Sequence, residues 1–224
     1  DEEGPLTRLP RERKTLTAVV TGTRGAPYWA ESGRPKADFF DLKGVLDHLA
    51  RRLGIETAYE RSSPAGFHPG RTAEVFAVAK DGSRTKLGRI GQLHPELQAV
   101  WELDDTYVFE LDFDALAEWA ELRADYRPLP KYPAASRDLA VVTDRYVPAG
   151  ALEATVKKAG GSCLESVRVF DVYTGEKLGA DKKSVALALV YRHADRTLTD
   201  EEVNAIHDRV IAALHECHGA ELRK

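Results

Sequence analysis

Three prolines stand within six residues near the middle of the chain: Pro128, Pro130 and Pro133. Proline fixes φ and has no backbone N–H to donate, so this segment can continue neither a helix nor a central strand. We expect an extended joint here, which divides the 224 residues into one domain over 1–127 and a second over 128–224. Each part is long enough to bury a hydrophobic core.

The first part has the pattern of an antiparallel sheet with few helices. An Asp81-Gly82 turn between two apolar runs indicates a hairpin. One helix is expected to begin at Asp41 as its N-cap and to end at Gly54, and Asp114 is expected to cap a later short helix. The expected strands, which are runs of apolar and β-branched residues, cover 16–21, 74–78, 87–91 and 107–111.

The second part alternates strands and helices in the order βαββαβ. Thr199 and Glu202 have the spacing of a capping box, and an apolar stripe that ends at Cys217 follows them. This order over about 95 residues predicts a ferredoxin-like α+β unit with both helices on one face of four strands. In chain order its expected elements cover 138–143, 149–159, 166–173, 184–192, the helix after 199, and 220–223.

Side chains alternate between the two faces of a strand, and this alternation sorts the residues of the second sheet. The bulkier sets, among them Arg168, Phe170 and Val172, are expected to pack on the helices. The remaining face is small and flat, and is predicted to hold Ala140, Val142, Val169, Asp171, Tyr173, Ser184, Ala186 and Ala188.

One ring, one carboxylate and one hydroxyl on a flat face suit an unpaired nucleic-acid base. An aromatic ring such as that of Tyr173 stacks on a base, and the Asp171 carboxylate can accept from adjacent donors such as N1–H and N2–H of guanine. A flat, alanine-rich face also suits packing on another domain, and the pattern alone favours that reading. Cations near the strand ends and hairpin are candidate phosphate contacts: Arg137, Lys177, Lys182, Lys183, Arg192 and Arg196.

Charge and hydropathy exclude several classes of protein. The formal net charge is −4, so any contact with nucleic acid has to be local. No apolar run approaches the roughly 18 residues of a membrane span. The only cysteines, Cys163 and Cys217, form no disulfide framework, which predicts a reducing compartment. The chain has no methionine, and we expect it to be a piece of a longer protein.

Two histidine groups suggest other kinds of site. His68, Arg71 and His94 lie near proline and glycine and form a candidate acid–base group, but no partner stands at a telling spacing, so a turn or an interface loop is favoured. His215 and His218 stand three residues apart on a helix. Such a pair can bind a metal, but without a further cluster of ligands we predict no metal site.

The chain resembles the C-terminal portion of the bacterial phenylalanine–tRNA ligase β-subunit family. The stretches that resemble its ferredoxin-fold anticodon-binding domain are 126–133, 137–142, 170–175, 183–184 and 191–202. Other stretches resemble the later half of the family's catalytic-like module, which is a class II synthetase sheet that has lost its chemistry. These stretches are 39–44, 67–71, 88–95 and 109–112.

The resemblance implies that residues 128–224 bind the anticodon loop of tRNA(Phe), whose first anticodon base is a guanine. The base-contacting positions of the family correspond to Ala140, Asp171, Tyr173 and Ser184. We expect phosphate contacts from Arg137, Lys183 and Arg192.

The resemblance also implies that residues 1–127 are a partial, non-catalytic class II module that serves assembly with the α subunit. It implies a cytoplasmic parent enzyme of two α and two β subunits that uses ATP and Mg²⁺. The editing module and the N-terminal modules of the family have no counterpart here. We therefore expect this chain to bind no cofactor and to catalyse no reaction by itself.

Overall fold

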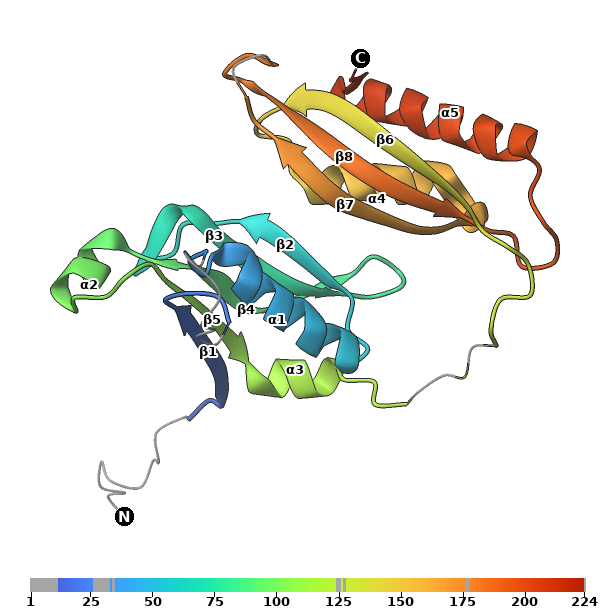
Figure 1. The fold of residues 1–224 in the computed structure, drawn as a ribbon. Helices are drawn as coiled ribbons and strands as arrows, with labels where there is room; N and C mark the ends of the chain where they lie inside the picture. Colours follow the sequence, from blue (N-terminus) through green and yellow to red (C-terminus); the bar gives the residue numbers. More distant parts are fainter. Residues whose placement is uncertain are drawn as a thin grey trace. The chain divides into compact units, whose positions relative to one another are not determined.

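The protein is described by a computed structural model that covers residues 12–25, 33, 35–123, 126, 128–175 and 178–223. The chain forms two compact units, over residues 1–125 and 126–224 (Figure 1). The described residues between 120 and 134 are in neither a helix nor a strand, as expected of the proline-rich segment. No helix in the described part of the chain is long and apolar enough to cross a membrane.

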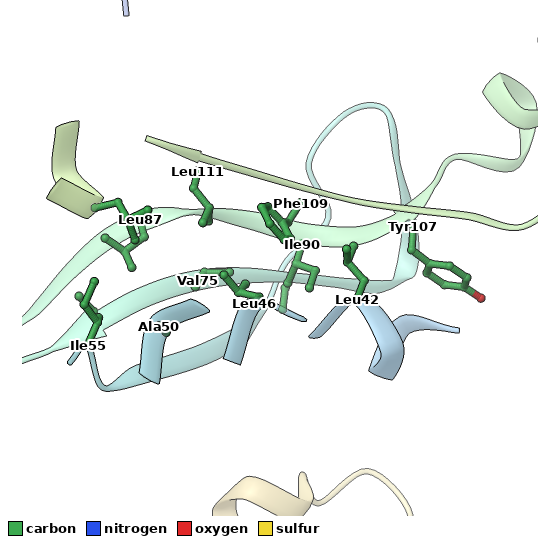
Figure 2. Close-up of a cluster of buried hydrophobic side chains, with 13 residues drawn as sticks. Leu42, Leu46, Ala50, Ile55, Val75, Leu87, Ile90, Tyr107, Phe109 and Leu111 are labelled. Carbon is green, nitrogen blue, oxygen red and sulfur yellow. The ribbon is translucent and has the colours of Figure 1, made fainter. Parts of the chain in front are cut away.

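The first unit is an antiparallel sheet of five strands in the order β1-β5-β4-β3-β2. Leu42, Leu46 and Ala50 of its first helix point at Val75 and Ile90 of the sheet and close the core (Figure 2). Its elements are β1 (Thr15–Thr21), α1 (Phe39–Arg52), β2 (Thr57–Arg61), β3 (Phe67–Val78), β4 (Arg84–Leu93), α2 (Pro95–Val100), β5 (Thr106–Asp112) and α3 (Phe113–Trp119).

Two helices of this unit begin at an earlier aspartate than the sequence predicted. Asp38 is the N-cap of α1, and Asp41 is its capping-box partner, whose carboxylate accepts from the backbone N–H of Asp38 (2.7 Å). Asp112, and not Asp114, caps α3. Both predictions were wrong because two aspartates stand close together at the start of each helix. Only the backbone angles of the folded chain determine which of the two is the N-cap.

The second unit has the βαββαβ order of a ferredoxin-like fold, which confirms the predicted α+β class. Its sheet has the strand order β7-β8-β6-β9, and α4 and α5 lie on one face of it (Figure 1). Its elements are β6 (Ala135–Asp144), α4 (Ala149–Gly160), the 3₁₀ turn η1 (Gly161–Cys163), β7 (Leu164–Tyr173), β8 (Lys182–Tyr191), α5 (Asp200–His218) and β9 (Glu221–Leu222).

The core of the second unit lies between the sheet and its two helices. Val185, Leu187 and Leu189 of β8 are fully buried against apolar side chains of α4 and α5. The capping box of Thr199 and Glu202 begins α5 as predicted. Cys217 does not belong to the buried stripe of α5, because its side chain is exposed.

Candidate nucleic-acid interface

The register of the second sheet brings four predicted residues together on the face without helices. Tyr173 stands opposite Ser184, and Asp171 stands opposite Ala186, which is paired on its other side with Ala140. Directly opposed residues of antiparallel strands share a face, and neighbouring strands lie about 4.8 Å apart. We call Ala140, Asp171, Tyr173 and Ser184 the four-residue patch.

A β-bulge in β7 changes the expected composition of this face. The register between β7 and β8 shifts between Val169 and Asp171, which leaves Phe170 as the extra residue. Arg168 therefore stands opposite Ala188 on the helix-free face, while Val169 stands opposite Leu187 and packs on the core.

The predicted faces of Arg168 and Val169 were wrong because the extra residue of a bulge reverses the alternation along its strand. Phe170 does not pack on the helices as predicted, since half of its side chain is exposed. Val172 lies on the predicted face, opposite Val185, but is also largely exposed. Asp171 and Tyr173 lie beyond the bulge and keep the face that alternation predicts.

The two polar groups of the patch have no partners in the described part of the chain. The Asp171 side chain is exposed and makes no hydrogen bond or ion pair with a described residue. Ser184 is only 2% exposed, and its hydroxyl has no hydrogen-bond partner among the described residues. Among the described residues, the only fully buried side-chain oxygen or nitrogen without a partner is Ser62 Oγ, so the Ser184 hydroxyl keeps some access to solvent.

Tyr173 forms one wall of the patch and is held there by two close neighbours. Its ring packs so closely on Gly175 that a Cβ at position 175 would lie 2.0 Å from the tyrosine hydroxyl oxygen. The guanidinium carbon of Arg223 lies 5.1 Å from the centroid of the same ring. The ring remains 38% exposed, so it can still be approached.

Arg223 is a residue of this face that the sequence analysis did not identify. Its backbone N–H donates to the carbonyl of Ala140 (2.9 Å), directly after β9. Glu221 stands opposite Val142 on the helix-free face, so alternation brings Arg223 to that face as well. The alternation along β9 could identify Arg223 only once the partner strand and the register of β9 were known.

The three predicted phosphate contacts are not part of the patch. Arg137 stands opposite Leu189 on the helix-packed face and donates to Asp200 (3.0 Å). Lys183 stands opposite the buried Thr143 and donates to the carbonyl of Val147. These two side chains therefore lie on the other side of the sheet.

Arg192 lies at the far end of β8 from Ser184, about 26 Å along an extended strand. It donates to Glu165 (2.8 Å) and to the carbonyl of Tyr132, and so ties the end of β8 to neighbouring segments. Arg196 is paired with Glu202 (2.6 Å). Lys177 lies outside the described residues.

Among the residues that the structure describes, the cations on the helix-free face are Arg168, Lys182 and Arg223. Lys182 stands opposite Asp144, one row beyond the patch, and lines a shallow hollow together with Arg145 and Gly175. The same register also places Asp138, Asp144 and Glu221 on this face, so its positive side chains stand among several carboxylates.

The rival histidine group has local structural partners. His68 Nδ1 accepts from the N–H of Gly70 (3.0 Å), and His94 caps α2 by accepting from the N–H of Glu96 (3.3 Å). Arg71 donates to Gln92 (2.7 Å). A hollow beside α2 is lined by His94 but by neither of the other two.

In the second histidine pair, His215 and His218, one side chain has a structural partner. His218 shares a hydrogen bond with the Thr155 hydroxyl (2.8 Å). Among the described residues, no group of three His, Cys, Asp or Glu side chains could hold a metal ion.

Comparisons with protein families match both units. Residues 130–223 match the ferredoxin-fold anticodon binding domain, and residues 2–113 match the phenylalanyl tRNA synthetase beta chain CLM domain. Curated phenylalanine–tRNA ligase beta subunits are similar to this chain over almost all of its length.

The beta subunit of Symbiobacterium thermophilum is 46% identical over 96% of this chain and 24% of its own length. Those of Shouchella clausii and Halalkalibacterium halodurans are 41% and 42% identical, each over 99% of this chain and 27% of their own length. The chain therefore spans about a quarter of the length of these relatives.

Proposed function

The chain belongs to the phenylalanine–tRNA ligase beta-subunit family, and on that premise we propose that its second unit binds the anticodon loop of tRNA(Phe). One observation carries the proposal. A carboxylate and a hydroxyl that have no hydrogen-bond partner among the described residues stand in adjacent rows with an aromatic ring on a helix-free sheet face. The match of this unit to an anticodon-binding family supports RNA over domain packing as the ligand of that face.

The chemistry of the patch suits an unpaired guanine, which we propose is the first anticodon base. The Asp171 carboxylate accepts from the guanine N1–H and N2–H groups, which lie on one edge of the base. Ser184 supplies a hydroxyl that can donate or accept. Ala140 leaves room for the base near the backbone, and Tyr173 stacks against it. A bidentate contact of this kind contributes about 1–3 kcal/mol of discrimination against the wrong base in nucleic-acid recognition.

For the first unit we propose assembly with the α subunit, in a cytoplasmic parent enzyme of two α and two β subunits that charges tRNA(Phe) with the use of ATP and Mg²⁺. In support, its match is to a beta-chain domain of the synthetase. Four apolar side chains around the end of α2 are exposed, an arrangement that suits contact with a protein: Leu97, Val100, Trp101 and Leu103. We propose that the chain alone neither activates phenylalanine nor edits.

Binding of an anticodon stem-loop to the 224-residue chain tests the proposed recognition. We expect measurable affinity for the stem-loop with guanine at the first anticodon position. Inosine at that position should bind more weakly because it lacks the N2 amino group. Two salt concentrations separate the phosphate contribution, which salt weakens, from the contribution of the base.

Asp171→Asn should lower the affinity about tenfold, because an amide presents one acceptor oxygen where the carboxylate presents two. Asp208→Asn is the matched control, since Asp208 is an exposed carboxylate on α5, on the opposite side of the sheet. Equal affinity for guanine and inosine, or no effect of Asp171→Asn, would show that the patch does not read the base. Absence of any binding would favour the packing of this face on another domain.

A further inference from the structure

The outer face of α1 in the first unit exposes apolar side chains to solvent. Leu42, Leu46 and Ala50 point at the sheet (Figure 2), so the opposite side of the helix is turned away from the core. On that side Phe40, in the first turn, is 73% exposed, and Val45, which borders the same face, is 52% exposed. Exposed apolar side chains gathered on one face are a feature of surfaces that bind another protein.

A glycine stands on this outer face in the interior of the helix. Gly44 follows Phe40 by four residues, so the two lie on one face of α1. Glycine in a helix interior is less favourable than alanine. Gly44 has no positive φ, and a Cβ at this position would meet no atom within 4 Å. Nothing in the described part of the chain therefore requires a glycine here, whereas the close approach of another helix would.

The same face ends in basic side chains. His48 and Arg51 continue the spacing of Phe40 and Gly44, and Arg52 lies beside them. All three basic side chains are exposed, and none makes a hydrogen bond or ion pair with a described residue. The helix dipole favours cations in the last turn, which accounts for the sign of the charge but leaves both guanidinium groups available to a carboxylate. A partner that covers this face is therefore expected to carry acidic side chains at one end.

The segment before α1 lies beside the segment that follows α2. The Lys36 ammonium, two residues before the N-cap of α1, lies 3.8 Å from the Asp104 carboxylate. Asp104 directly follows Leu103, which is one of the exposed apolar side chains around the end of α2. One partner can therefore contact both the outer face of α1 and the apolar side chains around α2.

We propose that a helix of the α subunit packs across α1 at Gly44, with an apolar side chain against Phe40 and a carboxylate near Arg51. The inference rests on the proposed assembly with the α subunit and adds a contact surface to it. The axes of packed helices lie about 8–10 Å apart, and the side chains at the crossing set this distance. Gly44 therefore allows a closer approach than any larger residue would.

The size of the face favours a subunit that also binds elsewhere over a second copy of this chain. The 14 residues of α1 extend over about 21 Å, and only one side of the helix is free. A stable dimer buries about 800 Å² on each partner, which is more than one face of so short a helix offers. The α subunit can add the contacts around α2, so the face of α1 need supply only a part of the interface.

The test measures the affinity of the 224-residue chain for the purified α subunit of the same organism by titration calorimetry. Gly44→Ala should bind about tenfold more weakly, because the added methyl group overpacks the helix crossing. The same variant should raise the melting temperature of the first unit by about 2–5 °C, since alanine is the better residue in a helix. Gly150→Ala is the matched control, because it also adds a Cβ in open space on a helix and should leave the affinity unchanged.

Two further variants examine the ends of the face. Phe40→Ser should lower the affinity about fivefold or more without lowering the melting temperature, because the side chain lies largely outside the core. Arg51→Gln should make the affinity less dependent on salt, because it removes a charge that faces a carboxylate.

Four results would overturn the α1 contact. Equal affinity of Gly44→Ala and the unchanged chain, together with a loss in Trp101→Ala, would refute it while leaving assembly through α2 intact. A lower melting temperature of Gly44→Ala would show that the fold itself requires the glycine. Self-association of the unchanged chain that Gly44→Ala removes would assign the face to a second copy. If the unchanged chain did not bind the α subunit, the α1 contact and the proposed assembly would both fail, and the stem-loop titration would still test anticodon binding separately.

Discussion

Replacing Gly175 with alanine should displace the Tyr173 ring without unfolding the protein. The added Cβ would lie 2.0 Å from the tyrosine hydroxyl oxygen, 2.2 Å from Cζ and 2.6 Å from Cε1. Ordinary contacts between such atoms are about 3.5–4.0 Å, so the ring has to move by about 1.5 Å or more. The backbone itself accepts alanine, because Gly175 is not among the glycines with positive φ.

The displaced ring should cost most of the stacking energy of the bound base. Stacking of a base on an aromatic side chain is worth about 1–3 kcal/mol, which corresponds to a loss of affinity between about fivefold and 150-fold. Titration with the anticodon stem-loop measures this loss. The free energy of unfolding in urea should change by less than about 1 kcal/mol, since the ring is largely outside the core.

A double-mutant cycle makes the reasoning refutable. If Gly175 acts only by placing the ring, Gly175→Ala should have no further effect in a Tyr173→Ala background. Gly150→Ala is the matched control, because a Cβ at that position meets no atom within 4 Å. The reasoning would be refuted if Gly175→Ala bound the stem-loop as tightly as the unchanged chain while Tyr173→Ala did not.

Three further predictions concern stability. Asp38→Ala should lower the free energy of unfolding of the first unit by about 0.5–2 kcal/mol in urea, whereas Asp114→Ala, which removes no cap, should change it much less. Arg196 and a backbone N–H lower the pKa of Glu202 to about 2. The ionised carboxylate therefore contributes to stability at a pH above its ordinary pKa of 4.5, and this contribution is lost as the pH falls toward 2. In Glu202→Gln, the melting temperature should depend less on pH between pH 6 and pH 3. Leu187→Ala should destabilise the second unit by about 2–5 kcal/mol, because Leu187 is fully buried between sheet and helices; urea unfolding followed in the 224-residue chain should show the transition of the first unit unchanged.

Much of the second unit could be predicted from local patterns. The periods of its apolar residues predicted the order of strands and helices, and the Thr199 capping box marked the start of α5. Alternation also placed Asp171, Tyr173 and Ser184 on one face, because they belong to regular segments of their strands. The same alternation puts Arg137 with Leu139 on the helix-packed face, so the sequence already argued against the phosphate contact that we assigned to Arg137.

Other features depended on how the strands pair. The bulge at Phe170 reversed the faces of Arg168 and Val169, and no local pattern marks it. Among the acidic residues before α1 and α3, only the backbone angles of the folded chain selected the caps.

The sequence by itself thus determined which elements form and which chemical groups the helix-free face contains, since side-chain periodicity is a local property of the chain. Only the tertiary structure decided that Arg223 meets Tyr173 from the opposite edge of the sheet. This contact joins residues about 50 positions apart, and it depends on the strand order β7-β8-β6-β9. That order results from the packing of the whole unit, because β9 can pair with β6 only after α5 has returned across the sheet.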